Sequence, residues 1–199
     1  MYFIELAVLH DDLHSLSALE ELYISGCGAL ESFSMHALQG LMSVRTLIIV
    51  SCPNLISLSE GMGYLACLER LVIRGCPRLV LPCNMNKLTS LLILSLQNLT
   101  LAHFDDLPES LGAMTSLQRI EVFSCTNARS LPNSFQNLIN LHTLLIFAYP
   151  TLEKRCKKGT GEDWKKIAHL PYFKLTAEKR YFTKEILDPW TSFSSLNRG

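Results

Sequence analysis

The stretch Leu68-Glu69-Arg70-Leu71-Val72-Ile73-Arg74-Gly75-Cys76-Pro77 decides the fold. It reads as leucine, two variable residues, leucine, one variable residue and a branched aliphatic, and it closes on a cysteine eight residues after the first leucine. The short apolar run predicts a β-strand, in which successive side chains point to opposite faces. Leu71 and Ile73 are therefore predicted to point inward, and Arg70, Val72 and Arg74 outward.

The same pattern occurs five more times, and its first positions lie 25, 24, 23, 26 and 24 residues apart. The other copies are Leu19/Leu22/Ile24/Cys27, Val44/Leu47/Ile49/Cys52, Leu91/Leu94/Leu96/Leu99, Leu117/Ile120/Val122/Cys125 and Leu141/Leu144/Ile146/Tyr149. This period is typical of leucine-rich repeats. The sequence therefore predicts an α/β solenoid, a leucine-rich-repeat horseshoe with a short-strand parallel sheet on the concave face and an irregular or short-helical convex side.

The pattern divides the chain into four parts. Residues 1–18 are predicted to hold an incomplete N-terminal repeat, because Leu13–Leu19 matches the residues that lead into later repeats. Residues 19–152 are predicted to form the solenoid of about six repeats, and 176–199 a loosely ordered tail. No polar cap is evident before Leu13, so we expect the outer edge of the first strand to be uncovered and the chain to be a fragment of a longer array.

Residues 153–175 are predicted to form a C-terminal capping motif. Thr160 suits a helix N-cap, and Trp164, Ile167 and Ala168 share one helical face before Pro171 ends the helix. We expect Trp164 to cover the open core of the last repeat.

Composition excludes several classes of function. Hydrophobic residues make up 48% of the chain and charged residues 18%, a balance that excludes a disordered tail. The chain has 18 basic residues (Lys and Arg) and 18 acidic residues (Asp and Glu). The resulting net charge of zero argues against a surface built for nucleic acid or anionic lipid. The first residues lack a basic start, so we expect no signal peptide. We expect no membrane span either, because the long uncharged stretch at 88–104 follows the repeat pattern.

Four of the seven cysteines occupy one repeat position, at Cys27, Cys52, Cys76 and Cys125. Their period predicts free thiols packed inside each turn rather than a disulfide framework. No C-x2-C pair is present for a zinc site, and the acidic pair Asp105-Asp106 is predicted to be a solvated turn. Reduced thiols favour an intracellular location. We expect no cofactor or metal.

The outward strand positions are the candidate binding site. Their charges balance, while several apolar side chains are expected to be exposed to water on the concave face, which is typical of an interaction surface. β-branched residues also favour strands in general, so this pattern has a purely structural alternative. The candidate protein-binding residues are Tyr23, Arg45, Ile48, Glu69, Arg70, Val72, Arg74, Ile93, Gln97, Arg119, Glu121, Phe123, His142, Leu145 and Phe147.

One stretch resembles a known family. The run Cys156-Lys157-Lys158-Gly159-Thr160-Gly161-Glu162-Asp163-Trp164, continuing to Pro171, resembles the C-terminal end of plant coiled-coil, nucleotide-binding, leucine-rich-repeat disease-resistance proteins. The Cys-Pro turns at Cys52 and Cys76 are similar as well, and the resemblance covers roughly residues 13–175. It implies a cytoplasmic module that recognises a pathogen effector or a guarded host protein and restrains the nucleotide-binding switch domain. The 199 residues contain no phosphate-binding loop, so the switch itself is not implied for this chain.

Three other functions compete with this interpretation. An extracellular repeat receptor fits the glycosylation sequon Asn98-Leu99-Thr100, and a substrate-recruiting subunit of a ubiquitin ligase fits the cysteine-ended repeats. An enzyme is the least favoured, because no histidine stands at a catalytic spacing from a nucleophile or carboxylate. His142 is predicted to be a contact residue. We expect the partners to be proteins, and we expect no binding to nucleic acid.

Overall fold

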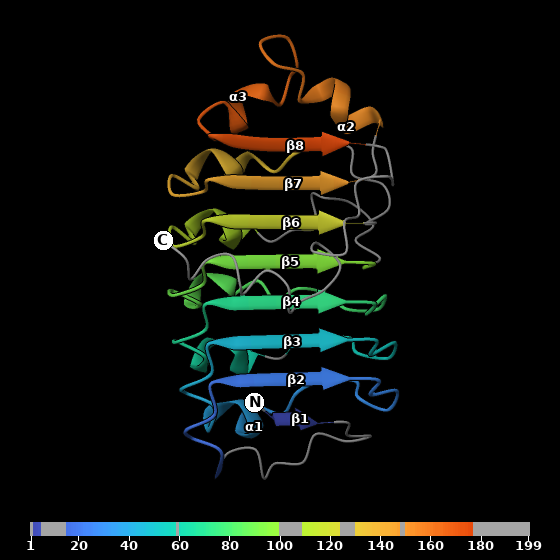
Figure 1. Cartoon of the computed structure of the whole chain (residues 1–199), viewed down its shortest axis with the longest axis vertical. Coiled ribbons are helices and arrows are strands. Elements are labelled where there is room, and N and C mark those ends of the chain that lie inside the picture. Colours follow the sequence, from blue (N-terminus) through green and yellow to red (C-terminus); the bar gives the residue numbers. More distant parts are fainter. Residues whose placement is uncertain are drawn as a thin grey trace, which may run out of the picture.

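The computed structural model describes residues 2–4, 15–58, 60–99, 109–123, 130–147 and 150–176. These residues form eight short strands that lie side by side in chain order as one parallel sheet (Figure 1). The strands are β1 (Tyr2–Ile4), β2 (Glu21–Ser25), β3 (Thr46–Val50), β4 (Arg70–Arg74), β5 (Ile93–Gln97), β6 (Arg119–Phe123), β7 (Thr143–Phe147) and β8 (Tyr172–Thr176). The predicted leucine-rich-repeat fold is confirmed.

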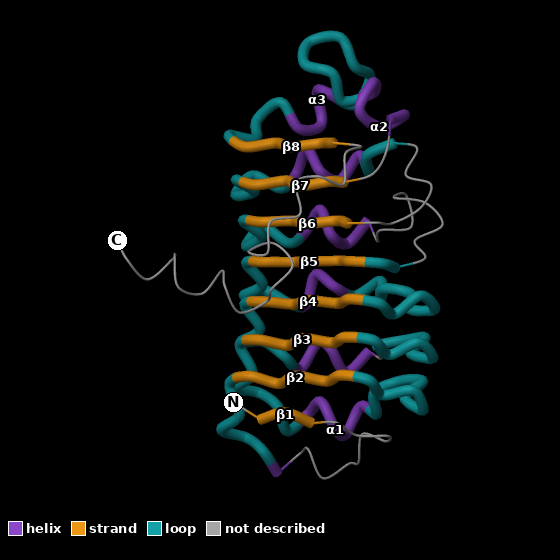
Figure 2. The backbone as a smooth tube through the Cα atoms, turned by 45° about the vertical axis from the view of Figure 1, so that its right-hand side comes forward, coloured by secondary structure: helices purple, strands orange, loops and turns teal. Residues whose placement is uncertain are grey.

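Short helical segments return the chain from one strand to the next. They lie on one side of the stack, opposite the open face of the sheet (Figure 2). They are the α-helices α1 (Met35–Gln39), α2 (Pro150–Arg155) and α3 (Trp164–Ile167) and the 3-10 helices η2 (Glu60–Tyr64), η3 (Met85–Lys87), η5 (Glu109–Ala113) and η6 (Asn133–Asn137). Their shortness fits the prediction of an irregular or short-helical convex side.

The register of the sheet stacks equivalent positions of successive repeats. Leu71 pairs with Leu47 on one side and with Leu94 on the other, and Ile73 pairs in the same way with Ile49 and Leu96. Each of these side chains is at most 1% exposed. A fully buried leucine contributes roughly 1.5–3 kcal/mol, and one repeat alone cannot bury its apolar face, so stability comes from stacking.

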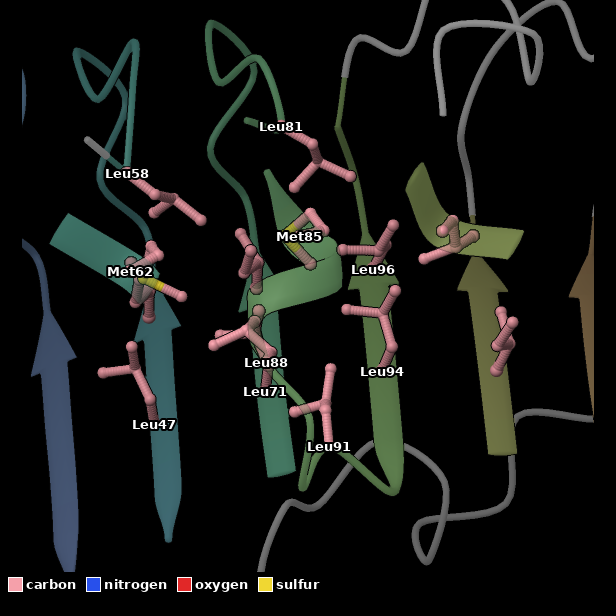
Figure 3. Packing of buried hydrophobic residues seen from close by; sticks show 14 of the residues in the cluster. Leu47, Leu58, Met62, Leu71, Leu81, Met85, Leu88, Leu91, Leu94 and Leu96 are labelled. Atoms are coloured by element: carbon pink, nitrogen blue, oxygen red, sulfur yellow. The ribbon is translucent and has the colours of Figure 1, made fainter. Parts of the chain in front are cut away.

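The returning segments fill the interior from the other side. In Figure 3, Met62 of η2 and Met85 of η3 lie among the buried leucines of the strands and turns. Both methionines are at most 1% exposed and belong to the same continuous core as the strands. The repeat pattern therefore fixes a two-sided core, with one wall from the strands and one from the short helices.

The repeat cysteines are buried free thiols, as predicted for Cys27, Cys52 and Cys76. Each Sγ lies 3.5–3.6 Å from the carbonyl oxygen two residues earlier, so the thiol satisfies a carbonyl at the end of its strand. Cys125 lies outside the described residues. Cys156, in the C-terminal segment, is also buried, and burial raises the pKa of its thiol to about 12.

A glycine in the left-handed region follows each of two strands. Gly26 and Gly75 adopt φ values of +68° and +66°, in the left-handed region that side chains disfavour. The Gly26 amide donates to the Val50 carbonyl, and the Gly75 amide donates to the Gln97 carbonyl. These bonds extend the interstrand ladder into the turn. Ser51 and Asn98 adopt the same conformation after β3 and β5, with φ values of +55° and +52°, and their amides donate to the Arg74 and Phe123 carbonyls.

A strand lies at each end of the sheet where the sequence predicted none. At the N-terminal end, β1 pairs with β2, with Tyr2 opposite Leu22 and Ile4 opposite Ile24. The expectation of an uncovered edge on the Glu21–Ser25 strand is therefore wrong, because β1 supplies its hydrogen-bonding partner. At the C-terminal end, β8 pairs with β7, so residues 153–175 include a strand as well as helical turns. Of the predicted tail at 176–199, Thr176 is the last residue of β8, and the rest lies outside the described residues.

The C-terminal segment folds around a buried carboxylate. Asp163 is 1% exposed, and its Oδ2 accepts from Arg155 Nε at 2.8 Å and from the Leu131 amide at 3.2 Å. Its Oδ1 lies 2.8 Å from Lys166 Nζ, which also donates to the Leu131 carbonyl at 2.5 Å. Burial alone would raise the pKa of Asp163, but these hydrogen bonds outweigh it and hold the pKa below its ordinary value. The network ties α2 and α3 to the preceding repeat.

The predicted capping helix is shorter than the sequence indicated. It begins at Trp164 with Asp163 at the N-cap position, so the prediction of Thr160 as N-cap is wrong. Asp163 makes no capping bond within the helix, because its oxygens serve the network with Arg155 and Lys166. Ile167 is buried, and the half-buried Trp164 packs against the core as expected.

Candidate protein-binding face

The outward positions of the strands form three parallel rows across the concave face. Each strand has a first, a central and a last outward residue, for example Arg70, Val72 and Arg74 of β4. The sheet register places each of them beside the equivalent residue of the neighbouring strands. Adjacent strands lie about 4.8 Å apart, so neighbours in a row contact one another. A patch on this face is therefore built from residues that are about 24 positions apart in sequence.

The structure places most of the predicted site residues in these rows. The first row contains Arg70, Ile93 and Arg119, the central row contains Tyr23, Ile48, Val72, Glu121 and Leu145, and the last row contains Arg74, Gln97, Phe123 and Phe147. Arg45, Glu69 and His142 lie just before β3, β4 and β7, where their backbones continue the ladder. Arg45 and Glu69 form an ion pair there.

An aromatic cluster occupies the C-terminal half of the face. The rings of Phe123 and Phe147 stack with centroids 4.7 Å apart and an interplanar angle of 28°. Leu145 joins them in an apolar cluster that is separate from the solenoid core. Such a pair contributes about 0.5–1.5 kcal/mol beyond the burial of its area. Because the stack lies outside the core, it is not required by the repeat pattern.

Charged side chains gather in the middle of the face. Arg119 Nε lies 2.6 Å from Glu121 Oε1 on the same strand. Arg70, on β4, is close enough to both groups for their charges to act on it. Burial lowers the pKa of the Arg70 guanidinium, Glu121 opposes that shift, and Arg119 adds to it. In the central row, Glu121 lies between Val72 on β4 and Leu145 on β7.

The expected exposure of the apolar outward residues is wrong for five of them. Ile48, Val72, Phe123, Leu145 and Phe147 are each only 2–4% exposed. The mutual packing of the phenylalanine cluster accounts for part of this burial, since stacked rings cover one another's faces. Ile93 keeps the intermediate exposure that an outward position on a sheet surface would have.

The eighth strand adds outward residues that the sequence interpretation missed. Tyr172 and Lys174 extend the first and central rows beyond Thr143 and Leu145. A signal for this strand was present: Leu170, Phe173 and Leu175 repeat the spacing of the first three positions of the pattern. It was obscured because the preceding repeat is longer than the others and carries α2 and α3.

The described residues were also searched for metal sites and membrane spans. Across these residues, no three His, Cys, Asp or Glu side chains are grouped so that they could hold a metal ion. The helices described are also all too short to cross a membrane. The concave face thus remains the principal candidate site.

Comparison with known proteins identifies the repeat type. Residues 3–198 match the family model described as a leucine-rich repeat region. The chain is 27% identical to "Protein SUPPRESSOR OF npr1-1, CONSTITUTIVE 1" of Arabidopsis thaliana, with 71% of this chain and 12% of that protein covered. It is 36% identical to "Disease resistance protein RGA2" of Solanum bulbocastanum, with 56% of this chain and 16% of that protein covered. The chain thus spans only a small part of the length of these relatives.

Solved structures agree on the fold. The leucine-rich-repeat ectodomain of the Arabidopsis receptor kinase HAESA, in complex with a peptide hormone, matches with a TM-score of 0.55 at 19% identity, covering 83% of this chain and 27% of that one. At this identity the likeness shows the fold alone. A leucine-rich-repeat region is a protein-interaction scaffold and not a class of enzyme. The chain belongs to the leucine-rich-repeat family, and its relatives include a plant protein that is named as a disease-resistance protein.

Proposed function

We propose that the chain is the protein-binding repeat module of a plant intracellular immune receptor. In this role it recognises a pathogen effector or a guarded host protein and restrains the receptor's nucleotide-binding domain. The observation that carries the proposal is the set of partly exposed charged side chains on the concave face, where the Arg45 and Glu69 side chains are 55% and 40% exposed and the Arg119 side chain is 40% exposed. Aromatic residues and arginine dominate the binding energy of protein interfaces.

The mechanism we propose is competition between two partners for one surface. The resting receptor holds its nucleotide-binding domain against the concave and lateral surface, and an effector that binds the same surface releases it. Such a switch needs the effector to favour the released state over the resting state by about 1–3 kcal/mol. Two relatives support the immune setting, because the proteins "Disease resistance-like protein DSC1" of Arabidopsis thaliana and "Disease resistance protein RGA2" are both named for disease resistance.

Two experiments test this proposal. Sequencing the transcript upstream of the codon for Met1 should reveal an in-frame phosphate-binding loop. The encoded nucleotide-binding domain should then co-purify with the full chain of residues 1–199 when the two are co-expressed. Absence of association between two folded proteins would refute the restraining role.

An extracellular receptor ectodomain is the alternative, supported by the sequon at Asn98, whose side chain is exposed in the turn after β5. Against it, Cys27, Cys52 and Cys76 are free and buried, whereas secreted proteins commonly pair their cysteines. Thiol titration of protein purified from plant tissue under denaturing, non-reducing conditions separates the two. Reduced cysteines support the intracellular role, and paired cysteines with a glycan on Asn98 support the ectodomain.

A further inference from the structure

Charge is distributed unevenly along the chain, although the whole chain has no net charge. Residues 1–44 contain six acidic residues and no lysine or arginine, whereas residues 153–174 contain seven basic residues and three acidic ones. Residues 45–152, between these two segments, are nearly balanced, with seven basic and six acidic residues. Because a solenoid stacks its repeats in chain order, this bias gives its two ends opposite charge.

Three carboxylates at the N-terminal end are available to a partner. Glu20 precedes β2, Glu21 begins it and Glu31 follows it; Glu20 and Glu31 are exposed, and Glu21 is half-buried. None of the three forms an ion pair with another described residue. Arg45 is the first lysine or arginine of the chain, and it is already paired with Glu69. The negative charge of this end is therefore not neutralised by the described residues.

Four exposed lysines at the C-terminal end are available in the same way. They are Lys154 of α2, Lys157 and Lys158 of the loop between α2 and α3, and Lys165 of α3. None of them forms an ion pair within the described residues. Glu162 and Asp163 do not neutralise them, because both carboxylates are paired with Arg155.

Backbone hydrogen bonds close the loop that carries Lys157 and Lys158. The Lys157 carbonyl accepts from the Gly161 amide at 2.8 Å, and the Arg155 carbonyl accepts from the Asp163 amide at 2.9 Å. A Cβ added at Gly161 would collide with the Arg155 carbonyl oxygen, so the loop packs tightly against the end of α2. The backbone that carries the two lysines is thus ordered before any partner binds, which lowers the entropy cost of binding.

The two charged groups are too far apart to neutralise each other within one chain. Figure 1 shows β2 and the loop between α2 and α3 at opposite ends of the stack. Six steps of ~4.8 Å separate β2 from β8, which is about 29 Å. The Debye length at physiological ionic strength is only ~8 Å, so the two groups are screened from each other. An attractive contact between them therefore requires two molecules.

We propose that the chain associates head to tail with a second copy of itself. The acidic N-terminal end of one copy, which carries Glu20 and Glu31, binds the basic C-terminal end of the next copy, which carries Lys157 and Lys158. The two sides of this contact are different surfaces, so it is heterologous and can continue from copy to copy. It leaves the outward rows of β3–β7 outside the contact and does not depend on the proposed function. Because the pairs are exposed, salt weakens the association.

Sedimentation velocity of the full chain over a concentration series tests the association. The sedimentation coefficient should rise with protein concentration in about 0.02 M salt, where the Debye length is roughly 20 Å, and stay constant in about 0.5 M salt, where it is roughly 4 Å. Lys157→Glu combined with Lys158→Glu should weaken the association at least about tenfold in low salt.

Arg78→Glu combined with Lys87→Glu is the matched control, because it makes the same change in net charge at exposed residues in the middle of the stack. The control should weaken the association much less than the change at Lys157 and Lys158 does. A native chain that stays monomeric in low salt, or equal losses in the two variants, would overturn the proposal. Thermal unfolding of each variant verifies that the solenoid is folded before the associations are compared.

A charge exchange tests whether the two ends meet. Glu20→Lys combined with Glu31→Lys gives a chain with two basic ends, and Lys157→Glu combined with Lys158→Glu gives one with two acidic ends. Neither variant should associate alone, and their equimolar mixture should associate in low salt. A mixture that stays monomeric would contradict head-to-tail binding.

Chemical crosslinking of the native chain locates the contact. A carbodiimide joins a carboxylate to an amine that lies against it, with loss of water. In a mixture of isotopically labelled and unlabelled chains, links that combine the two labels should join peptides containing Glu20 or Glu31 to peptides containing Lys157 or Lys158. Mixed-label links confined to other peptides would contradict the assignment of the two ends.

Discussion

The buried carboxylate of the C-terminal segment gives the sharpest prediction about stability. Asp163→Asn keeps the shape of the side chain but removes the charge that Arg155 and Lys166 share. Breaking a buried ion pair costs about 3–5 kcal/mol, because the remaining charge stays buried without its partner. We expect the lower end, about 3 kcal/mol, because the Arg155 side chain is 32% exposed and keeps its ion pair with Glu162.

The loss of stability should be confined to the C-terminal end, because each repeat of a solenoid contacts only its neighbours. A loss of about 3 kcal/mol makes opening of this end roughly a hundredfold more frequent. Hydrogen exchange measured by mass spectrometry should therefore accelerate by that factor in β8 and α3, and much less in β3 and β4. Glu162→Gln is the matched control: the Glu162 side chain is 75% exposed, and a surface pair contributes about 0–1 kcal/mol. If Asp163→Asn behaves like Glu162→Gln, the network does not hold the cap as described.

Three further predictions follow from the fold. Hydrogen bonds hold the pKa of Asp163 below its ordinary value, so the stability that its carboxylate contributes is complete above about pH 4 and is lost as the pH falls through the folded-state pKa. Chemical unfolding at pH 7 and at pH 3 should therefore show a smaller loss of unfolding free energy in Asp163→Asn than in the native protein. Among the described cysteines, Cys67 and Cys83 should react with maleimide in the native protein, and the others only after unfolding; rapid native reaction of the repeat cysteines would contradict their burial. Gly75→Ala should cost about 1–2 kcal/mol of unfolding free energy because of its positive φ, whereas Gly28→Ala, which meets open space, should change it by less than about 0.5 kcal/mol.

The repeat pattern predicted the features that periodicity encodes. Leu71 and Ile73 point inward and Arg70 and Arg74 outward, because a strand alternates its faces and each repeat meets a copy of itself. The two outermost strands were missed for different reasons. The position that would match Leu19 in the repeat of β1 falls before residue 1, and the repeat that leads to β8 is lengthened by α2 and α3.

The state of the concave face could not be predicted from the strands. Whether Val72 is exposed depends on what lies above the sheet, and strand periodicity carries no information about that. The role of Asp163 was missed in a similar way, because its partner Leu131 is 32 residues away and belongs to another repeat. Both features arise from contacts between segments that no local pattern connects.

The most direct test of the proposed binding face is the affinity of the full chain for the nucleotide-binding domain that we propose belongs to the same receptor, measured by isothermal titration calorimetry. Arg119→Glu reverses a half-exposed charge in the middle of the concave face, and Lys157→Glu makes the same change on the exposed C-terminal segment. We expect Arg119→Glu to weaken binding by at least about tenfold, or about 1.4 kcal/mol, and Lys157→Glu to leave it unchanged. Equal affinities for the two variants and the native chain would contradict a binding role for the concave face.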